Sequence, residues 1–178
     1  MIKVALLLLT SVVVAGTLLP ARLLNAADAD QAVRSLQGIN GLQVAVEDLQ
    51  PNLQKYTKKQ DISRERIQAS VENQLQAAGI KVLGKDEWLQ KPGRPVLYVN
   101  VNTHEFQKYQ FAYDVRIELR QVVSLDANPT VKTLAATWST SMTGVVNTGT
   151  TDRINDYVKQ LVQIFISAYS SANQREVR

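Results

Sequence analysis

The fold is decided by residues 95–123, which read PVLYVNVNTHEFQKYQFAYDVRIELRQVV. From residue 109 onward, alternate side chains form two faces, which is typical of a strand with one buried and one solvated side. The side expected to be buried comprises Tyr109, Phe111, Tyr113, Val115, Ile117, Leu119, Gln121 and Val123. The shorter arm, residues 96–102, is apolar on both sides at its start, which favours a place nearer the centre of the sheet. The stretch therefore predicts a β-hairpin with its bend near His104–Lys108.

Three elements are expected between residue 41 and the hairpin. Alternation over residues 41–49 predicts a strand, which Pro51 ends. Residues 64–78 have apolar side chains at helical spacing, with Ser63 in the N-cap position and a glycine directly after the last turn. Residues 80–83 predict another short strand. A strand, a helix and a strand in this order favour a right-handed crossover with the two strands parallel.

The connections outside these elements carry weaker patterns. Residues 28–37 predict a short helix that ends at Gly38. We expect residues 84–94 to form a loop in which Trp88 and Leu89 cover the edge of the core, ending in the turn Lys91–Pro95.

A strand and a long helix are expected after the hairpin. Residues 131–146 alternate, and one face comprises Leu134, Ala136, Trp138, Thr140 and Met142. The helix is capped by Thr150 or Thr151 and has Asp152 in its first turn. Its apolar stripe comprises Ile154, Tyr157, Val158, Leu161, Ile164, Phe165, Ala168 and Tyr169. Beyond residue 170 we expect the chain to fray.

The order of elements predicts an α+β fold, a two-layer α/β sandwich. The sheet is expected to be mixed, mainly antiparallel and made of about five strands, with two helices on one face. The chain has 178 residues, of which 45% are hydrophobic and 20% are charged, so residues 28–178 are expected to form a single domain.

The first 27 residues predict a signal peptide. Lys3 precedes an uncharged apolar run over residues 4–19, and small residues suitable for cleavage surround Ala27. The alternative is a retained membrane anchor, but the run has 16 residues against the roughly 20 that cross a bilayer. The chain contains no cysteine, which excludes both a lipid-attachment site and disulfides. We therefore expect a periplasmic or secreted bacterial protein with no stable membrane span after cleavage.

The charge of the chain gives little support to nucleic-acid binding. The formal net charge is +4, and loss of Lys3 and Arg22 with the leader would reduce it to +2. Because the remaining charges of both signs are interleaved, we expect a soluble exported protein with no nucleic-acid partner.

Few residues suit catalysis or metal binding. The only histidine, His104, lies beside Glu105 near the expected hairpin bend, and these two residues with Asp114 are the polar candidates for proton transfer. There is no cysteine nucleophile, no G-x-S-x-G serine motif and no phosphate-binding glycine motif. We expect a protein that is not an enzyme and has no cofactor.

A metal site is not expected either. Asp114 and Glu118 share a strand face, but arginines alternate with them, and opposite charges at this spacing favour ion pairs on a solvated face.

Surface recognition remains the favoured role. The candidate binding residues around the hairpin are Lys91, Arg94, Tyr98, Lys108 and Tyr109. Basic residues interleaved with aromatics can bind a single-stranded nucleic acid or a glycan. The alternative is that the aromatics build the core and the lysines keep the loops soluble. A second candidate surface is the polar series Thr133, Thr137, Ser139 and Ser141, which can favour pairing with a partner strand or a homo-oligomer.

Four short sequence segments resemble those of uncharacterised secreted bacterial proteins. They are VAVEDL at 44–49, AGIKVL at 78–83, PGRPVLYV at 92–99 and ATWS at 136–139. With the order of elements, residues 38–173 resemble the α/β domains of envelope proteins, namely the N-terminal domain of TolB, curli-secretion lipoproteins and penicillin-binding-protein activator lipoproteins. The lipoprotein families have a lipid-attachment cysteine, which this chain lacks. The resemblance implies a fold and a compartment and transfers no functional residues.

These observations together predict a non-enzymatic binding or assembly module of the bacterial cell envelope, which acts through contacts with another envelope protein. The alternative is a hydrolase that acts on an envelope polymer, or a protein that binds a small ligand or a glycan.

Overall fold

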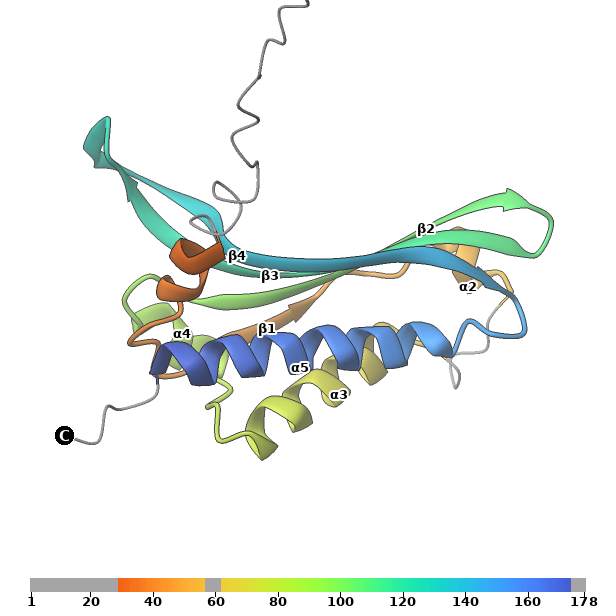
Figure 1. The fold of residues 1–178 in the computed structure, drawn as a ribbon, viewed down its shortest axis with the longest axis horizontal. Helices are drawn as coiled ribbons and strands as arrows, with labels where there is room; N and C mark the ends of the chain where they lie inside the picture. Colours follow the sequence, from red (N-terminus) through yellow and green to blue (C-terminus); the bar gives the residue numbers. More distant parts are fainter. Residues whose placement is uncertain (1–28, 57–61, 174–178) are drawn as a thin grey trace, which may run out of the picture.

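One layer of the protein is a four-stranded sheet in the order β1-β2-β3-β4, in a computed structural model that describes residues 29–56 and 62–173 (Figure 1). β1 (Gln43–Val46) is parallel to β2 (Val96–Gln107). β2 pairs antiparallel with β3 (Gln110–Leu125), and β3 pairs antiparallel with β4 (Asn128–Asn147). The sheet is thus mixed and mainly antiparallel, as the sequence predicts.

The second layer consists of the two long helices. Figure 1 shows α3 (Arg64–Ala77) and α5 (Arg153–Asn173) side by side along the same face of the sheet. Two short helices, α2 (Pro51–Gln54) and α4 (Lys85–Gln90), lie in connections, and residues 29–34 are helical as well. No helix in the described ranges is long and apolar enough to cross a membrane. The predicted signal peptide lies outside the described residues.

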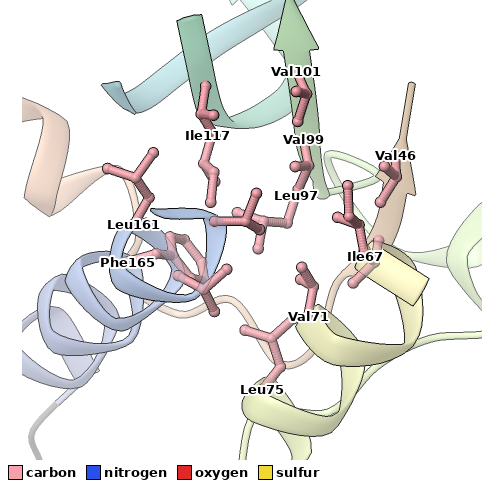
Figure 2. Close-up of a cluster of buried hydrophobic side chains, with 14 of the residues drawn as sticks. Val46, Ile67, Val71, Leu75, Leu97, Val99, Val101, Ile117, Leu161 and Phe165 are labelled. Carbon is pink, nitrogen blue, oxygen red and sulfur yellow. The ribbon is translucent and has the colours of Figure 1, made fainter. Parts of the chain in front are cut away.

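The core fills the space between the sheet and the two long helices (Figure 2). The members labelled in the close-up are Val46, Leu97, Val99, Val101 and Ile117 from the sheet, Ile67, Val71 and Leu75 from α3, and Leu161 and Phe165 from α5. In β3 the alternate residues from Phe111 to Leu119 are all buried. The alternation of this strand is therefore confirmed over its central part.

The boundaries of α3 are confirmed by their caps. The Ser63 hydroxyl accepts a hydrogen bond from the Arg66 backbone N–H at 3.2 Å. At the other end Gly79 has a φ of +76°, and the Ile80 N–H donates to the Leu75 carbonyl at 2.9 Å. Glycine adopts this left-handed conformation without the steric cost of a side chain.

Removal of the N-cap hydroxyl is expected to weaken α3. Because Ser63→Ala leaves the Arg66 N–H without its side-chain acceptor, we expect the free energy of unfolding to fall by about 1 kcal/mol. Urea unfolding followed by circular dichroism measures this change. Ser63→Asp restores an acceptor and serves as the control, so equal losses in both variants would contradict a capping role.

The predicted strand 80–83 does not form as a strand, although its predicted parallel orientation is present at one residue pair. This segment makes only one parallel bridge to the sheet, between Leu42 and Val82, so the sheet has four strands among the described residues and not about five. The strand parallel to β1 within the sheet is β2. The segment stays close to β1 for one residue pair because Gly84 and the α4 helix follow immediately and turn the chain away.

The predicted loop 84–94 contains α4. Asp86 and Glu87 lie in the first turn of this helix, where negative charge is favourable. Leu89 is exposed and does not cover the core, whereas Trp88 is partly buried. The turn that follows is as expected: Gly93 has a φ of +71°, and the Arg94 N–H donates to the Lys91 carbonyl at 3.1 Å, as in a type II turn.

One face of β4 is predicted incorrectly because of a bulge. The register to β3 shifts between the pairs Leu119–Trp138 and Arg120–Ala136, so Thr137 is an extra residue. Trp138 faces the core, as predicted. Because of the bulge, the residues before Trp138 that were expected on its face lie on the opposite face of the sheet, and Leu134 is 55% exposed. A single extra residue reverses the faces because side chains alternate with a period of two.

The buried face of α5 is wider than the predicted stripe. Ile164 is 48% exposed, whereas Val162 and Ile166 are buried. α5 contacts β3, β4 and also α3, so apolar side chains on the flank of the helix are covered as well as those that face the sheet. Asp152 lies just before the helix, and the acidic residue of its first turn is Asp156.

The end of α5 is fixed and does not fray before residue 173. The Asn173 side chain donates to the Leu36 carbonyl at 3.0 Å and accepts from the Gly38 N–H at 2.9 Å. The Tyr169 hydroxyl donates to the Ile39 carbonyl. Residues 36–39 are therefore fastened to the last turns of α5.

Tyr113 gives the domain an alkaline dependence of stability. Its ring stacks on Tyr157 with centroids 5.0 Å apart, and burial, followed by the contact with the Tyr157 hydroxyl, raises the pKa of Tyr113 to about 12. The neutral phenol is favoured in the fold, so its contribution is complete below the unfolded pKa of about 10 and is lost as the pH rises towards 12.

The free energy of unfolding is therefore expected to fall between pH about 10 and 12, and Tyr113→Phe is expected to reduce this fall. Urea unfolding at a series of pH values tests it. An unchanged alkaline slope in Tyr113→Phe would show that other groups cause the loss.

Candidate functional site: the open face of the sheet

The face of the sheet away from α3 and α5 is the candidate site, and we call it the open face (Figure 1). Because β2 and β3 bury alternate residues against the helices, the intervening side chains lie on the open face. Its members are Glu47 next to β1, Tyr98, Asn100, Asn102 and His104 on β2, Ala112, Asp114, Arg116, Glu118 and Arg120 on β3, and Ser139, Ser141, Thr143 and Val145 on β4.

Arg120 organises one end of the open face. Its guanidinium carbon lies 3.5 Å from the centroid of the Tyr98 ring, a cation–π contact. Its Nε and Nη2 atoms lie 2.8 and 2.7 Å from the same Glu118 carboxylate oxygen. This arrangement holds Tyr98, Glu118 and Arg120 in fixed positions.

Arg116 continues the charged series along β3. Its guanidinium lies 3.6 Å from the Asp114 carboxylate and 3.9 Å from the Glu118 carboxylate. The alternating carboxylates and guanidinium groups therefore form ion pairs on this face, as the sequence predicts.

A series of side-chain amides on β2 lies beside the charged side chains of β3. The Glu47 carboxylate accepts hydrogen bonds from the Tyr98 hydroxyl and from the Asn100 side chain. Asn102 donates to the Asn100 side-chain oxygen at 2.9 Å and accepts from Gln50 at 2.6 Å. Burial, followed by the hydrogen bond to Glu47, raises the pKa of Tyr98, so its hydroxyl stays a donor at neutral pH.

Two hollows lie on the open face. The first has a volume of about 220 Å³ and is lined by Tyr98, Asn100, Asn102, Asp114, Arg116, Glu118 and Arg120. The second is wider, about 660 Å³, and extends across β2, β3 and β4 from Asn102 and His104 to Thr143 and Val145. Val145 is 61% exposed, so the second hollow presents apolar surface beside polar groups.

The three candidates for proton transfer are not brought together. His104 and Asp114 both line the wider hollow, but Glu105 belongs to the opposite face of β2. Its carboxylate accepts a hydrogen bond from the Tyr109 N–H at 3.2 Å and so helps to close the hairpin turn. His104 is exposed and lies in the strand, opposite Ala112, because the turn comes later than expected.

The hairpin turn consists of Lys108 and Tyr109, between the paired residues Gln107 and Gln110. Tyr109 has a φ of +69° and is 47% exposed. Its predicted core position is therefore wrong. The turn takes Tyr109 out of the alternating pattern that begins with Phe111.

The five candidate binding residues lie at three separate places. Tyr98 belongs to the open face, and Lys91 and Arg94 lie in the turn before β2, where Lys91 pairs with Glu87 at 3.6 Å. Lys108 and Tyr109 lie at the far hairpin turn, ten residues beyond Tyr98, which is about 33 Å along a strand. They do not form one patch with Tyr98.

Sequence reasoning missed the amide series and Glu47. Asn100 and Asn102 alternate with buried residues of β2, and this alternation was the available signal. Glu47 follows a different strand, and only the parallel pairing of β1 with β2 brings it to Tyr98 and Asn100.

No group of three or more histidine, cysteine, aspartate or glutamate side chains in residues 29–56 and 62–173 is placed to hold a metal ion. No protein-family model matches the chain, and no curated protein matches its sequence. The resemblance to envelope α/β domains therefore stays a prediction, and the geometry of the open face is the basis for a proposed function.

Proposed function

We propose that this protein is an exported, non-enzymatic binding or assembly module of the bacterial cell envelope, and that its open face contacts another envelope protein. The observation that carries the proposal is that the two long helices cover one face of the sheet, while the other face presents an ordered array of charged and amide side chains. The leader-like sequence of residues 1–27 supports the compartment.

The fixed positions of these side chains favour recognition of a partner. Arg120, Glu118 and Tyr98 are already fixed by mutual contacts, so little side-chain freedom is lost when a partner binds. Groups of both signs alternate within a short distance, which favours specificity through complementary charges.

Capture from an envelope extract tests the proposal. The tagged full chain is compared with Arg116→Glu, which reverses the charge between two carboxylates, and with Lys85→Glu, which makes the same charge change on α4. We expect the wild type and Lys85→Glu to capture the same protein, and Arg116→Glu to capture at least about tenfold less. No captured protein above background, or equal capture by all three, would contradict the proposal.

A glycan or small ligand is the second candidate, because the hollow of about 220 Å³ is lined by amides, carboxylates and guanidinium groups that can bind hydroxyl groups. The Arg120 guanidinium already occupies one face of the Tyr98 ring, which leaves less aromatic surface for a sugar. Titration calorimetry with soluble fragments of envelope polysaccharide distinguishes the two candidates. Heat that Arg116→Glu abolishes would favour the glycan.

A further inference from the structure

The free edge of β4, with its unpaired backbone groups, is a second surface that borders the open face. β4 is the last strand in the sheet order, so among the described residues it pairs with β3 alone. An unpaired edge exposes backbone N–H and C=O groups that can pair with another strand. Natural sheets protect such edges with proline, charge, bulges or a covering segment.

Within the part of the chain that the structure describes, these protections occur only in the first half of β4. Pro129 and Lys132 lie near its start, the bulge is at Thr137, and the Thr137 carbonyl accepts a hydrogen bond from the Ser35 hydroxyl at 3.0 Å. From residue 138 to residue 147 the register to β3 is regular, and the sequence contains neither proline nor charge. Ten residues of edge are therefore suited to pair with another strand.

The charges around this edge suit a second copy in antiparallel orientation. Residues 133–151 contain no charged side chain, and the nearest charges along the chain are Lys132 before them and Asp152 after them. An antiparallel pair places the Lys132 end of one strand towards the Asp152 end of the other. A parallel pair would place like charges together, which is unfavourable.

We infer that two copies of this chain pair through residues 138–147 of β4, antiparallel, about a two-fold axis at Met142. The two sheets then form one continuous sheet with the long helices of both copies on the same face. In this register Ser141 lies opposite the partner's Thr143, and Ser139 lies opposite the partner's Val145.

The charges of the neighbouring strand are compatible with this register and disfavour the two adjacent ones. Across β3 and β4, Arg116 lies beside Ser141 and Asp114 beside Thr143. An axis at Met142 therefore puts Arg116 of each copy in the same row as the partner's Asp114. An axis at Ser141 would align Arg116 of one copy with Arg116 of the other across the strands. An axis at Thr143 would align the two Asp114 side chains in the same way. An axis at Met142 or at Thr140 places opposite charges in such rows, because Glu118 lies beside Ser139. Of these two positions, Met142 is the midpoint of the uncharged residues 133–151.

A cysteine at the axis tests the register directly. The chain has no cysteine, so Met142→Cys introduces the only thiol. Directly opposed residues of antiparallel strands have Cα atoms about 4.5–5.5 Å apart, which a disulfide can bridge. We expect oxidised Met142→Cys to run as a linked dimer on a non-reducing gel, and Leu134→Cys, exposed on the same strand, to stay monomeric.

Paired charges test the same register in solution. Ser141→Lys with Thr143→Lys places two lysines opposite each other at both pairs, and we expect the dimer dissociation constant from sedimentation equilibrium to rise at least about tenfold. Ser141→Lys with Thr143→Glu places lysine opposite glutamate, and we expect the dimer to persist. Asn128→Lys with Thr130→Lys adds the same charge at the other end of β4 and controls for net charge. Thermal unfolding checks that each variant is folded.

A wild-type protein that sediments as a monomer at every concentration would overturn the inference. Dissociation of both Ser141/Thr143 double variants with an intact fold, or failure of Met142→Cys to form the linked dimer, would also overturn it. The dimer and the proposed envelope partner are tested separately, because sedimentation and disulfide formation use the purified protein alone, so a failed capture experiment leaves the result for the dimer unchanged.

Discussion

Phe165→Ala is expected to lower the free energy of unfolding by about 3–5 kcal/mol. Phe165 is fully buried on α5, and its ring lies 5.2 Å from that of Trp138 on β4, at an angle of 70°. It also contacts Tyr169, with centroids 6.1 Å apart. Removal of the ring leaves a cavity between α5 and the sheet, and cavities of this size are only partly filled by relaxation.

The matched control for Phe165→Ala is a substitution of the preceding residue. Ile164 belongs to the same helix turn but is 48% exposed, so Ile164→Ala is expected to cost less than about 1 kcal/mol. Urea unfolding of both variants measures the difference. Similar losses in the two variants would mean that α5 does not dock on the sheet with the face described above.

Gly41→Ala is expected to cost about 3 kcal/mol, for two separate reasons. Gly41 has a φ of +119°, a conformation that an alanine rarely adopts. An added Cβ would also lie 2.8 Å from the Leu83 Cδ2 atom and 3.1 Å from the Lys81 carbonyl oxygen. The close approach of residues 81–83 to the start of β1 therefore depends on the missing side chain.

Gly84→Ala is the control for this substitution. Gly84 precedes α4, its φ is −69°, and no atom lies within 4 Å of the position of an added Cβ. We expect Gly84→Ala to change the free energy of unfolding by less than about 1 kcal/mol. A Gly41→Ala variant as stable as Gly84→Ala would contradict the described contact between Gly41 and Leu83.

The open face shows which contacts a local sequence pattern can predict and which it cannot. The alternation of Asp114, Arg116, Glu118 and Arg120 predicts ion pairs on a solvated face, because such pairs form between neighbours on one strand, and they are present. The contact of Tyr98 with Arg120 and the hydrogen bond from Tyr98 to Glu47 join segments that are far apart in the sequence. No periodicity within one segment contains that information.

The sequence by itself determined the elements whose patterns are local and long: α3 with its caps and the alternating centre of β3. Local hydrogen bonds and a repeating apolar face fix such elements within one segment. Only the tertiary structure decided the bulge at Thr137, the single bridge at Val82 and the burial of Val162 and Ile166. Each of these depends on how closely another part of the chain approaches, and that distance is set by the packing of the two layers.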